Sequence, residues 1–424
     1  MGNQSVPDIR PDYQSPNYDP EKIAPYTLED PLTFLDGSRV TSPEDWKKRR
    51  HEILGIFARE MLGEEPPAPA ADELVTELFE EKEDALGGFA VRSQYKMWFR
   101  KDKSGPCINW LLLRPRYADK KVPVILFLNY RGNHEIIPDE AIPVYDVWYP
   151  ATEDHKVVVE RGSMTNPNNP TYLPIGMLLS AGYAVMSANY CEISPDPNAD
   201  DVGEFDQKTF SYTGVFELWG KRDESRTDNT TALGAWAWAL SRGLDLAERI
   251  PQLDTAKAVV TGCSRLGKAA LIAAARDERF AVCVANQCGG GGATLAKRDF
   301  GENIATEMAM FSHWYCKAYD KYKRNPAQLL TFDQHLLLAA VAPRRLFIQG
   351  FNKKWFDTEG EYLACKAAGC VWEFLGKEGL PGEAYPASFE TSAIGRDLAY
   401  YHRSEEHGLA AIDWFLLLNF AMAK

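Results

Sequence analysis

The 424-residue chain lacks the features that mark membrane-spanning and exported proteins. No apolar run approaches the roughly 18 residues that suggest a membrane-spanning helix. The polar, proline-rich start MGNQSVPDIRPDYQSPNYDP has no basic region followed by an apolar stretch. We therefore expect no membrane partner. The sequence as it stands favours a cytoplasmic location, and a trimmed leader would instead mean secretion or the periplasm.

Basic residues are outnumbered by acidic ones, and sequence motifs typical of metal sites are missing. Lysine and arginine number 47 against 60 aspartate and glutamate residues, and the net charge is −13. Since phosphate binding needs a basic surface, this balance excludes a general nucleic-acid binder. The eight cysteines are widely spaced, with no CxxC pair and no His/Cys cluster at zinc spacing. We expect no metal site, with most of the cysteines buried as small apolar side chains.

What remains is the composition of an ordinary globular protein, with 45% hydrophobic and 25% charged residues. We expect residues 1–73 to form an N-terminal arm, a helix at 42–62 and a Pro/Ala-rich linker at 64–73, packed on the catalytic domain. The catalytic domain itself is assigned to residues 74–424, because no internal repeat or second self-contained unit is visible. The polar segment 131–175 is expected to form loops over the edge of a sheet.

Continuous apolar, β-rich runs alternate with helical segments along most of the chain. Runs such as VPVILFLNY (122–130), GYAVMSANY (182–190) and KAVVTGC (257–263) are typical of strands buried on both faces. Helical segments are expected at 230–250, 268–277 and 410–423. Strands that alternate with helices indicate a mostly parallel sheet covered on both faces. The predicted fold class is α/β, an α/β-hydrolase three-layer sandwich.

The stretch VVTGCSRLGKAAL (259–271) carries the first candidate for chemistry. A buried strand, a tight turn bearing Ser264 and a following helix match the geometry of a nucleophile elbow. The usual pattern is G-x-S-x-G. Gly262 fits it, but the second glycine is Gly267, one position late. At a helix N-terminus the hydroxyl would meet unpaired N–H groups that favour an oxyanion.

A serine nucleophile needs a base, and in this fold the histidine follows the nucleophile in the chain. Four histidines follow Ser264, at positions 313, 335, 402 and 407. His407 is the best placed, because the polar stretch HRSEEHGL lies between an apparent strand (396–402) and the last helix. A loop there would hang at the carboxyl end of the sheet, over the elbow.

Several ordered motifs together resemble the glucuronoyl esterases of carbohydrate esterase family fifteen, especially their bacterial members. The segment GCSRLGKAALIAAARDERF is similar to their elbow. Further motifs agree in order and spacing: LNYRGNHE (128–135), GYAVMSANYCEISPD (182–196), GAWAWALSRGLDL (234–246), CGGGGATLAKRDFGENI (288–304), FSHWYC (311–316), APRRLF (342–347), EGEYL (359–363) and HRSEEHGLAAIDWF (402–415). The resemblance covers roughly residues 120–420, which makes it far more specific than an elbow alone.

The resemblance implies a reaction and a set of site residues. Members of this family cleave the ester that joins 4-O-methyl-glucuronic acid on xylan to lignin alcohols, without a metal or cofactor. By position, Ser264 would be the nucleophile, His407 the base and Arg265 an oxyanion donor. Lys268, Glu302 and Trp355 would line the uronate site. A guanidinium beside the serine can give charge-assisted hydrogen bonds to an oxyanion, which supports the role implied for Arg265.

One expected part of the triad is missing from the sequence. The family places the acid either after the strand that follows the elbow or after a later strand near the tryptophan. The first position holds Gln287, and the second region reads FNKKWFD, with Asn352 and Lys353 where acids are expected. Gln287 can orient an imidazole but cannot stabilise imidazolium as a carboxylate does. Asp357 is kept as a weak alternative for the acid.

A disulfide described for fungal members is excluded as well. There, a cysteine beside the serine bonds one beside the histidine, whereas here Gly408 follows His407. Cys263 is then expected to be a free, partly buried thiol.

Two alternatives to glucuronoyl ester hydrolysis stay open. One is another carbohydrate esterase on the same scaffold, such as an acetyl-xylan deacetylase. The other is a catalytically weakened hydrolase that binds acidic xylan, which the missing acid supports. The expected partner is glucuronoxylan or a lignin–carbohydrate ester, and the chain is expected to act as a monomer.

Overall fold

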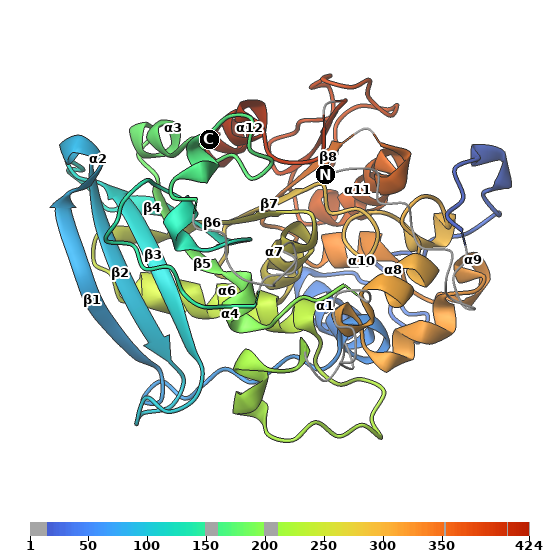
Figure 1. The fold of residues 1–424 in the computed structure, drawn as a ribbon. Coiled ribbons are helices and arrows are strands. Elements are labelled where there is room, and N and C mark those ends of the chain that lie inside the picture. Colours follow the sequence, from blue (N-terminus) through green and yellow to red (C-terminus); the bar gives the residue numbers. More distant parts are fainter. Residues whose placement is uncertain (1–14, 149–159, 199–210, 352, 405, 424) are drawn as a thin grey trace.

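A nine-stranded sheet forms the centre of the computed structural model, which describes residues 15–148, 160–198, 211–351, 353–404 and 406–423 (Figure 1). The strand order across the sheet is β1-β2-β3-β5-β4-β6-β7-β8-β9. The strands are β1 (Val75–Asp84), β2 (Ala90–Trp98), β3 (Cys107–Pro115), β4 (Val122–Asn129), β5 (Ala184–Asn189), β6 (Leu253–Cys263), β7 (Val282–Asn286), β8 (Arg345–Phe351) and β9 (Leu398–Arg403).

The sheet is parallel where the candidate site lies and antiparallel at one edge. All neighbouring pairs from β5 to β9 are parallel. β1, β2 and β3 form an antiparallel meander that joins β5 in antiparallel fashion. β1 and β2 form a hairpin that is closed by the short turn α2 (Ala85–Gly88). The prediction of a mostly parallel α/β sheet is confirmed.

Helices cover both faces of the sheet, as the continuous apolar strands require. One core cluster joins the sheet to α1 (Pro43–Phe57), α6 (Ala232–Glu248), α7 (Arg265–Arg276), α10 (Gln334–Ala339) and α11 (Thr358–Phe374). The opposite cluster joins it to α3 (Ile175–Ser180) and α12 (Ala411–Met422). The remaining short helices are α4 (Tyr190–Ile193), α8 (Ile304–Met310) and α9 (Pro326–Leu329). This is the expected three-layer sandwich.

Segments outside the central sheet follow the sequence expectations in part. Trp46, Ile53 and Phe57 of α1 belong to the same core cluster as the main helical layer. The division into an arm and a domain at residue 73 stays a prediction. The described parts of 131–175 contain loops, the first residue of α3 and two short 3₁₀ turns, Asn133–Glu135 and Ser163–Thr165. No helix in the described ranges is both long and apolar enough to cross a membrane.

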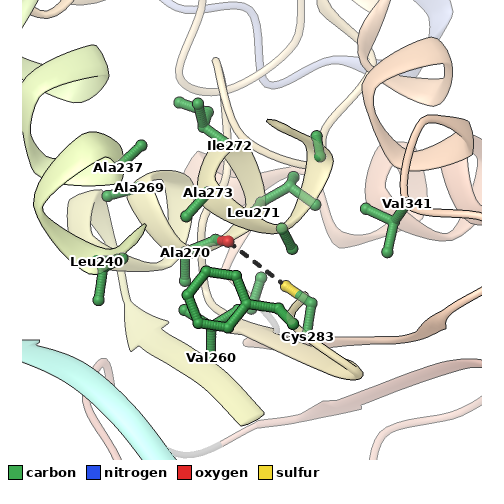
Figure 2. Packing of buried hydrophobic residues seen from close by; sticks show 14 of the residues in the cluster. Ala237, Leu240, Val260, Ala269, Ala270, Leu271, Ile272, Ala273, Cys283 and Val341 are labelled. Atoms are coloured by element: carbon green, nitrogen blue, oxygen red, sulfur yellow. Dashed lines mark hydrogen bonds between the residues drawn. The ribbon is translucent and has the colours of Figure 1, made fainter. Parts of the chain in front are cut away.

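Helix α7 lies close against the sheet because its inward residues are small (Figure 2). Ala269, Ala270 and Ala273 are fully buried beside β6 and α6. The thiol of Cys283 on β7 approaches the carbonyl of Ala270 at 3.7 Å. At the start of the helix, Gly267 lies so near β7 that an added Cβ would stand 2.7 Å from the carbonyl oxygen of Asn286. This close approach places the helix N-terminus directly above the end of β6.

Replacing Gly267 by alanine tests this close packing. The new methyl group would meet backbone that cannot rotate away, so we expect a loss of about 1–3 kcal/mol in the free energy of unfolding. Gly176→Ala in α3 is the matched control, because a Cβ there meets nothing within 4 Å. That control should gain roughly 0.5–1 kcal/mol from helix propensity. Denaturant unfolding would measure both, and an equal effect of the two substitutions would contradict the packing argument.

Candidate active site

The predicted nucleophile, base and glutamine all lie at the carboxyl edge of the parallel strands. Ser264 directly follows β6, Gln287 directly follows β7, and His407 lies in the loop between β9 and α12. Ligand sites of open α/β sheets lie at this edge, where loops from neighbouring strands converge. The structure thus gathers residues that are 143 positions apart along the chain.

Ser264 adopts the strained backbone of a nucleophile elbow. Its φ of 57° and ψ of −129° lie in a region that residues with a Cβ rarely adopt. The turn is held because the amide of Ser264 donates to the carbonyl of Asn286 at 2.8 Å. A Cβ on Gly262 would stand 2.2 Å from the carbonyl oxygen of Leu266, so only glycine fits there. The elbow therefore forms although its second glycine is displaced by one position.

The cysteine next to the elbow is a structural residue. Cys263 is buried and forms no disulfide. Burial raises the pKa of its thiol to about 12. Because the thiolate is the reactive form, this cysteine does not compete with Ser264 as a nucleophile.

Gln287, which stands at one of the two positions where the triad acid was expected, is fixed by the backbone beside His407. Its Oε1 lies 2.6 Å from Nδ1 of His407 and accepts from the amide of Gly408 at 2.9 Å. Its Nε2 donates to the carbonyl of Gly408 at 2.7 Å. An amide N–H can only donate and a carbonyl can only accept, so both contacts fix which end of the glutamine faces the imidazole. The oxygen faces Nδ1, which must then carry the proton and leaves Nε2 as the basic nitrogen.

The electrostatic surroundings keep His407 neutral. Burial, the largest cause, and the positive charges of Arg265, Lys353 and Arg403 together lower its pKa to about 4. The ring also lies against Phe356, with centroids 4.9 Å apart. Among the residues that the structure describes, the recorded partner of Nδ1 is the uncharged Gln287, so no carboxylate there opposes these effects. The histidine is therefore available as a base at neutral pH but forms imidazolium with difficulty.

The weak alternative for the acid, Asp357, is engaged elsewhere. Its carboxylate binds Arg298 through two contacts of 2.7 and 3.2 Å, and it caps α11 by accepting from the amide of Gly360. The structure brings Gln287, not Asp357, to Nδ1 of His407. Asn352, the other position considered, lies outside the described residues.

The other histidines that follow the elbow serve different contacts. His335 meets the carbonyl of Glu29 at 2.8 Å. His402 meets the carbonyl of Pro386 at 2.9 Å and stacks on a tyrosine. His313 contacts Asp196, as described next.

Arg265 is anchored by a fully buried carboxylate. Its Nη1 donates to Asp196 at 2.5 Å. The same carboxylate meets His313 Nε2 at 2.8 Å, Trp314 Nε1 at 2.7 Å and the hydroxyl of Tyr190 at 3.2 Å. Burial alone would raise the pKa of Asp196, but Arg265 and His313 hold it well below its usual range. Asp196 is therefore an ionised anchor that holds the guanidinium of Arg265, the residue next to the predicted nucleophile Ser264.

Part of the Arg265 side chain remains accessible to a ligand, with 22% of it exposed. Its Nε is buried and has no hydrogen-bond partner among the described residues. Its guanidinium also lies over the rings of Phe311 and Trp314, at 5.0 and 4.9 Å. A rigid, partly unsatisfied guanidinium one residue from Ser264 suits a developing oxyanion.

Lys268, one turn after Ser264, is buried between two carboxylates. Its Nζ lies 2.8 Å from Glu307 and 3.3 Å from Glu302, and 4.8 Å above the ring of Trp314. Burial opposes the charge of Lys268, but Glu302 and Glu307 raise its pKa. Burial likewise raises the pKa of Glu307 to about 7, although Lys268 opposes the shift, and Tyr315 donates to it at 2.6 Å. The structure thus brings Lys268 and Glu302 together, as the uronate-site prediction requires.

Trp355, the third residue predicted for the uronate site, lies on the loop that contacts Glu302. The amide of Glu302 donates to the carbonyl of Trp355 at 2.6 Å. Its side chain is partly exposed. The tryptophan loop and the glutamate loop are therefore joined through their backbones.

Sequence reasoning missed two of the supporting residues. Asp196 was visible only as an acidic turn after a strand, and Glu307 follows Glu302 by five positions without any motif. Only the three-dimensional structure shows that Glu302 and Glu307 both contact the buried Lys268. Within the described ranges, no group of three or more His, Cys, Asp or Glu side chains is placed to hold a metal ion.

Comparison with known proteins agrees with this arrangement. A family model described as the glucuronyl esterases of fungi matches residues 163–376. The curated carbohydrate esterase MZ0003, from an unknown prokaryotic organism, is 32% identical over 420 residues, which is 98% of this chain and 93% of that protein. This chain belongs to the glucuronoyl esterases, carbohydrate esterase family fifteen.

Other members of the family agree over nearly the whole chain. A solved glucuronoyl esterase from Solibacter usitatus is 33% identical with a TM-score of 0.84, over 95% of this chain and 99% of that one. A promiscuous esterase of family fifteen from a marine bacterial metagenome gives the same identity and TM-score, over 96% and 99%. The 4-O-methyl-glucuronoyl methylesterase of Schizophyllum commune is 28% identical over 82% of this chain and 74% of its own.

The anchoring of Arg265 can be tested by substituting its carboxylate partner. Asp196→Asn keeps the size of the side chain and removes its charge. We expect kcat on an ester substrate to fall about 10- to 100-fold with KM little changed, somewhat less than the ~10²–10³ for losing an oxyanion donor outright.

A double-mutant cycle separates this role from a general structural one. If Asp196 acts through the guanidinium, Asp196→Asn should lower kcat little further in an Arg265→Ala background. A full additional loss in that background would contradict the anchoring role.

Proposed function

We propose that this chain hydrolyses esters of 4-O-methyl-glucuronic acid that link glucuronoxylan to lignin alcohols. The observation that carries the proposal is the joint placement of Ser264, His407 and Arg265 at one edge of the sheet. Family membership makes the chain a carboxylic ester hydrolase. The 4-O-methyl-glucuronoyl methylesterases among its relatives support the uronate as the acid part of the ester.

In the first half of the reaction, Oγ of Ser264 attacks the ester carbonyl while Nε2 of His407 takes the hydroxyl proton. The contact between Nδ1 and Gln287 supports this step, because it leaves Nε2 free of a proton. The carbonyl oxygen becomes an oxyanion beside the guanidinium of Arg265. The alcohol then leaves with the proton from His407, and a uronyl ester remains on the serine.

The second half repeats the chemistry with water. His407 takes a proton from the water molecule, whose oxygen attacks the acyl carbon and forms a second oxyanion beside Arg265. Collapse returns the proton to Oγ of Ser264 and releases the uronate. Lys268 and Glu302 are assigned to the sugar, with the glutamate able to hold hydroxyl groups and the lysine to face the uronate.

The amide of Gln287 in place of a carboxylate also favours a lower turnover than a complete Ser-His-acid triad would give. Gln287 supplies the correct tautomer of His407 but no negative charge for imidazolium. Replacing the triad acid by an amide in a serine protease costs roughly 10⁴ in turnover, partly through the wrong tautomer. Here the tautomer is correct, so the cost should be smaller. A binder of acidic xylan with little turnover is the second candidate, and Gln287 is the observation that favours it.

Turnover of benzyl glucuronate beside p-nitrophenyl acetate tests the proposal. We expect the wild-type chain to hydrolyse the glucuronate, and Ser264→Ala to lose this activity by at least about 10³-fold. Hydrolysis of the acetate alone would favour a different carbohydrate esterase. No turnover of either ester by folded protein would favour the xylan binder, and equal activity of the two variants would refute the nucleophile.

The pH dependence of kcat/KM tests the role of Gln287. His407 must be neutral to act and its pKa is lowered to about 4. Activity should therefore stay constant from pH 7 down to about pH 5 and fall with a midpoint near 4. Gln287→Glu places a carboxylate at Nδ1, which should raise the pKa of His407 by about 1–3 units. The midpoint of the fall in kcat/KM should then move to higher pH by the same amount.

The gain in kcat for Gln287→Glu should stay below the ~10⁴-fold seen between amide and acid in a serine protease. In Gln287→Glu, the second carboxylate oxygen would face the carbonyl oxygen of Gly408, which in the wild-type chain accepts from Nε2 of Gln287 at 2.7 Å. Two acceptors would then face each other, which offsets part of the gain. Two results would contradict this account of His407. One is a wild-type kcat/KM that already falls with a midpoint near pH 6.5, and the other is a midpoint that Gln287→Glu does not move.

A further inference from the structure

The N-terminal arm is attached to the two loops that carry the predicted uronate-site residues. The amide of Gly301 donates to the carbonyl of Asn17 at 2.8 Å. Nζ of Lys354 donates to the carbonyl of Tyr18 at 3.1 Å. Each of these two donors immediately precedes a predicted uronate-site residue in the chain. The arm therefore lies along the rim of the candidate active site.

A hollow of about 580 Å³ opens where the arm meets these loops. It is lined by Ser15, Pro16, Asn17, Tyr18, Asp19, Lys22 and Asp299. Asp299 also lines a second, much smaller cavity together with Glu302 and Glu307. Since Glu302 and Glu307 both contact Lys268, the hollow adjoins the site in which the uronate is expected. Its volume falls within the ~300–1,000 Å³ of ordinary ligand sites.

The side chains of this hollow suit a neutral, hydroxyl-rich ligand. Tyr18 is 41% exposed, and one edge of its ring meets Phe300 with centroids 6.4 Å apart. Such a fixed, half-exposed ring offers an apolar face to sugar C–H bonds. The charged groups are Asp19, Lys22 and Asp299, of which the first two pair at 3.7 Å. Two acids against one lysine disfavour a second uronate, whereas carboxylates readily accept hydrogen bonds from hydroxyl groups.

We propose that the arm residues Asn17–Lys22 together with Asp299 bind neutral pentose units of the xylan main chain, next to the esterified uronate. The proposal rests on the proposed function and extends it from the uronate to the polymer that bears it. The uronic acid is a side group of that polymer, so an enzyme that holds it must also meet main-chain sugars. The arm residues line the hollow and would contact those sugars.

The wild-type chain gives the first test without any substitution. Two benzyl esters are compared, one of glucuronic acid alone and one of 4-O-methyl-glucuronic acid attached to a xylotetraose. We expect kcat/KM to be at least about tenfold higher for the oligosaccharide ester, mostly through KM. Equal values would overturn the arm proposal and leave the proposed function intact. Absence of turnover of both esters would refute the proposed function itself.

Substitution of Tyr18 then locates the effect on the arm. Tyr18→Ala should lower the preference for the oligosaccharide ester about three- to tenfold, the size expected for losing one aromatic contact. Tyr18→Phe keeps the ring and should retain most of the preference. An unchanged preference in folded Tyr18→Ala protein would overturn the proposal.

A tyrosine elsewhere on the surface provides the matched control. Tyr117 is 79% exposed and follows β3. Because β3 runs antiparallel to β5, this end lies at the edge of the sheet away from Ser264. Tyr117→Ala should leave both esters unaffected. A loss of preference in Tyr117→Ala equal to that in Tyr18→Ala would also overturn the assignment to the arm.

Discussion

The contact between Gln287 and His407 is the constraint on which the catalytic arrangement depends. A glutamine side chain in isolation could present either end to the imidazole, and only one end gives a working base. Gly408 removes this freedom by engaging both ends of the amide, with a donor on one and an acceptor on the other. Because Gly408 directly follows His407, the residue that orients the glutamine moves with the base. These hydrogen bonds thus tie Gln287 both to His407 and to Gly408, two consecutive residues between β9 and α12.

Close backbone approaches at the elbow set the position of the nucleophile relative to that unit. The amide of Ser264 and the α7 residue Gly267 both lie against Asn286, the residue immediately before Gln287. The end of β7 therefore contacts the nucleophile through one residue and the base through the next. A shift of α7 away from the sheet would change the distance between Ser264 and His407. The small alanine side chains that bring α7 close to the sheet thus help to set the geometry of the candidate site as well as stability.

Much of this arrangement could be predicted from the sequence, and the rest could not for definite physical reasons. Continuous apolar runs identified the strands that carry Ser264 and Gln287, because a strand buried on both faces has few polar residues. Helix α11 was read only as a short motif, since its buried glutamate at position 361 interrupts the apolar pattern. The carboxylate of Asp196 and the pair around Lys268 involve residues far apart in the chain. Such contacts follow from the fold, and no local pattern of residue types encodes them.

The charges around the site explain how a triad without an acid can still favour the reaction. Arg265, Lys268 and Arg403 lower the pKa of His407, and so they oppose imidazolium. The same positive charges favour the oxyanion, which forms in the same step as imidazolium. A triad carboxylate would favour imidazolium but would also weaken the positive potential at the oxyanion. If these residues act as proposed, Gln287 in place of the acid shifts stabilisation from the base to the oxyanion beside Arg265, which Asp196 anchors. The glutamine is therefore consistent with a working hydrolase whose transition state is stabilised mainly at the developing oxyanion and less at the imidazolium.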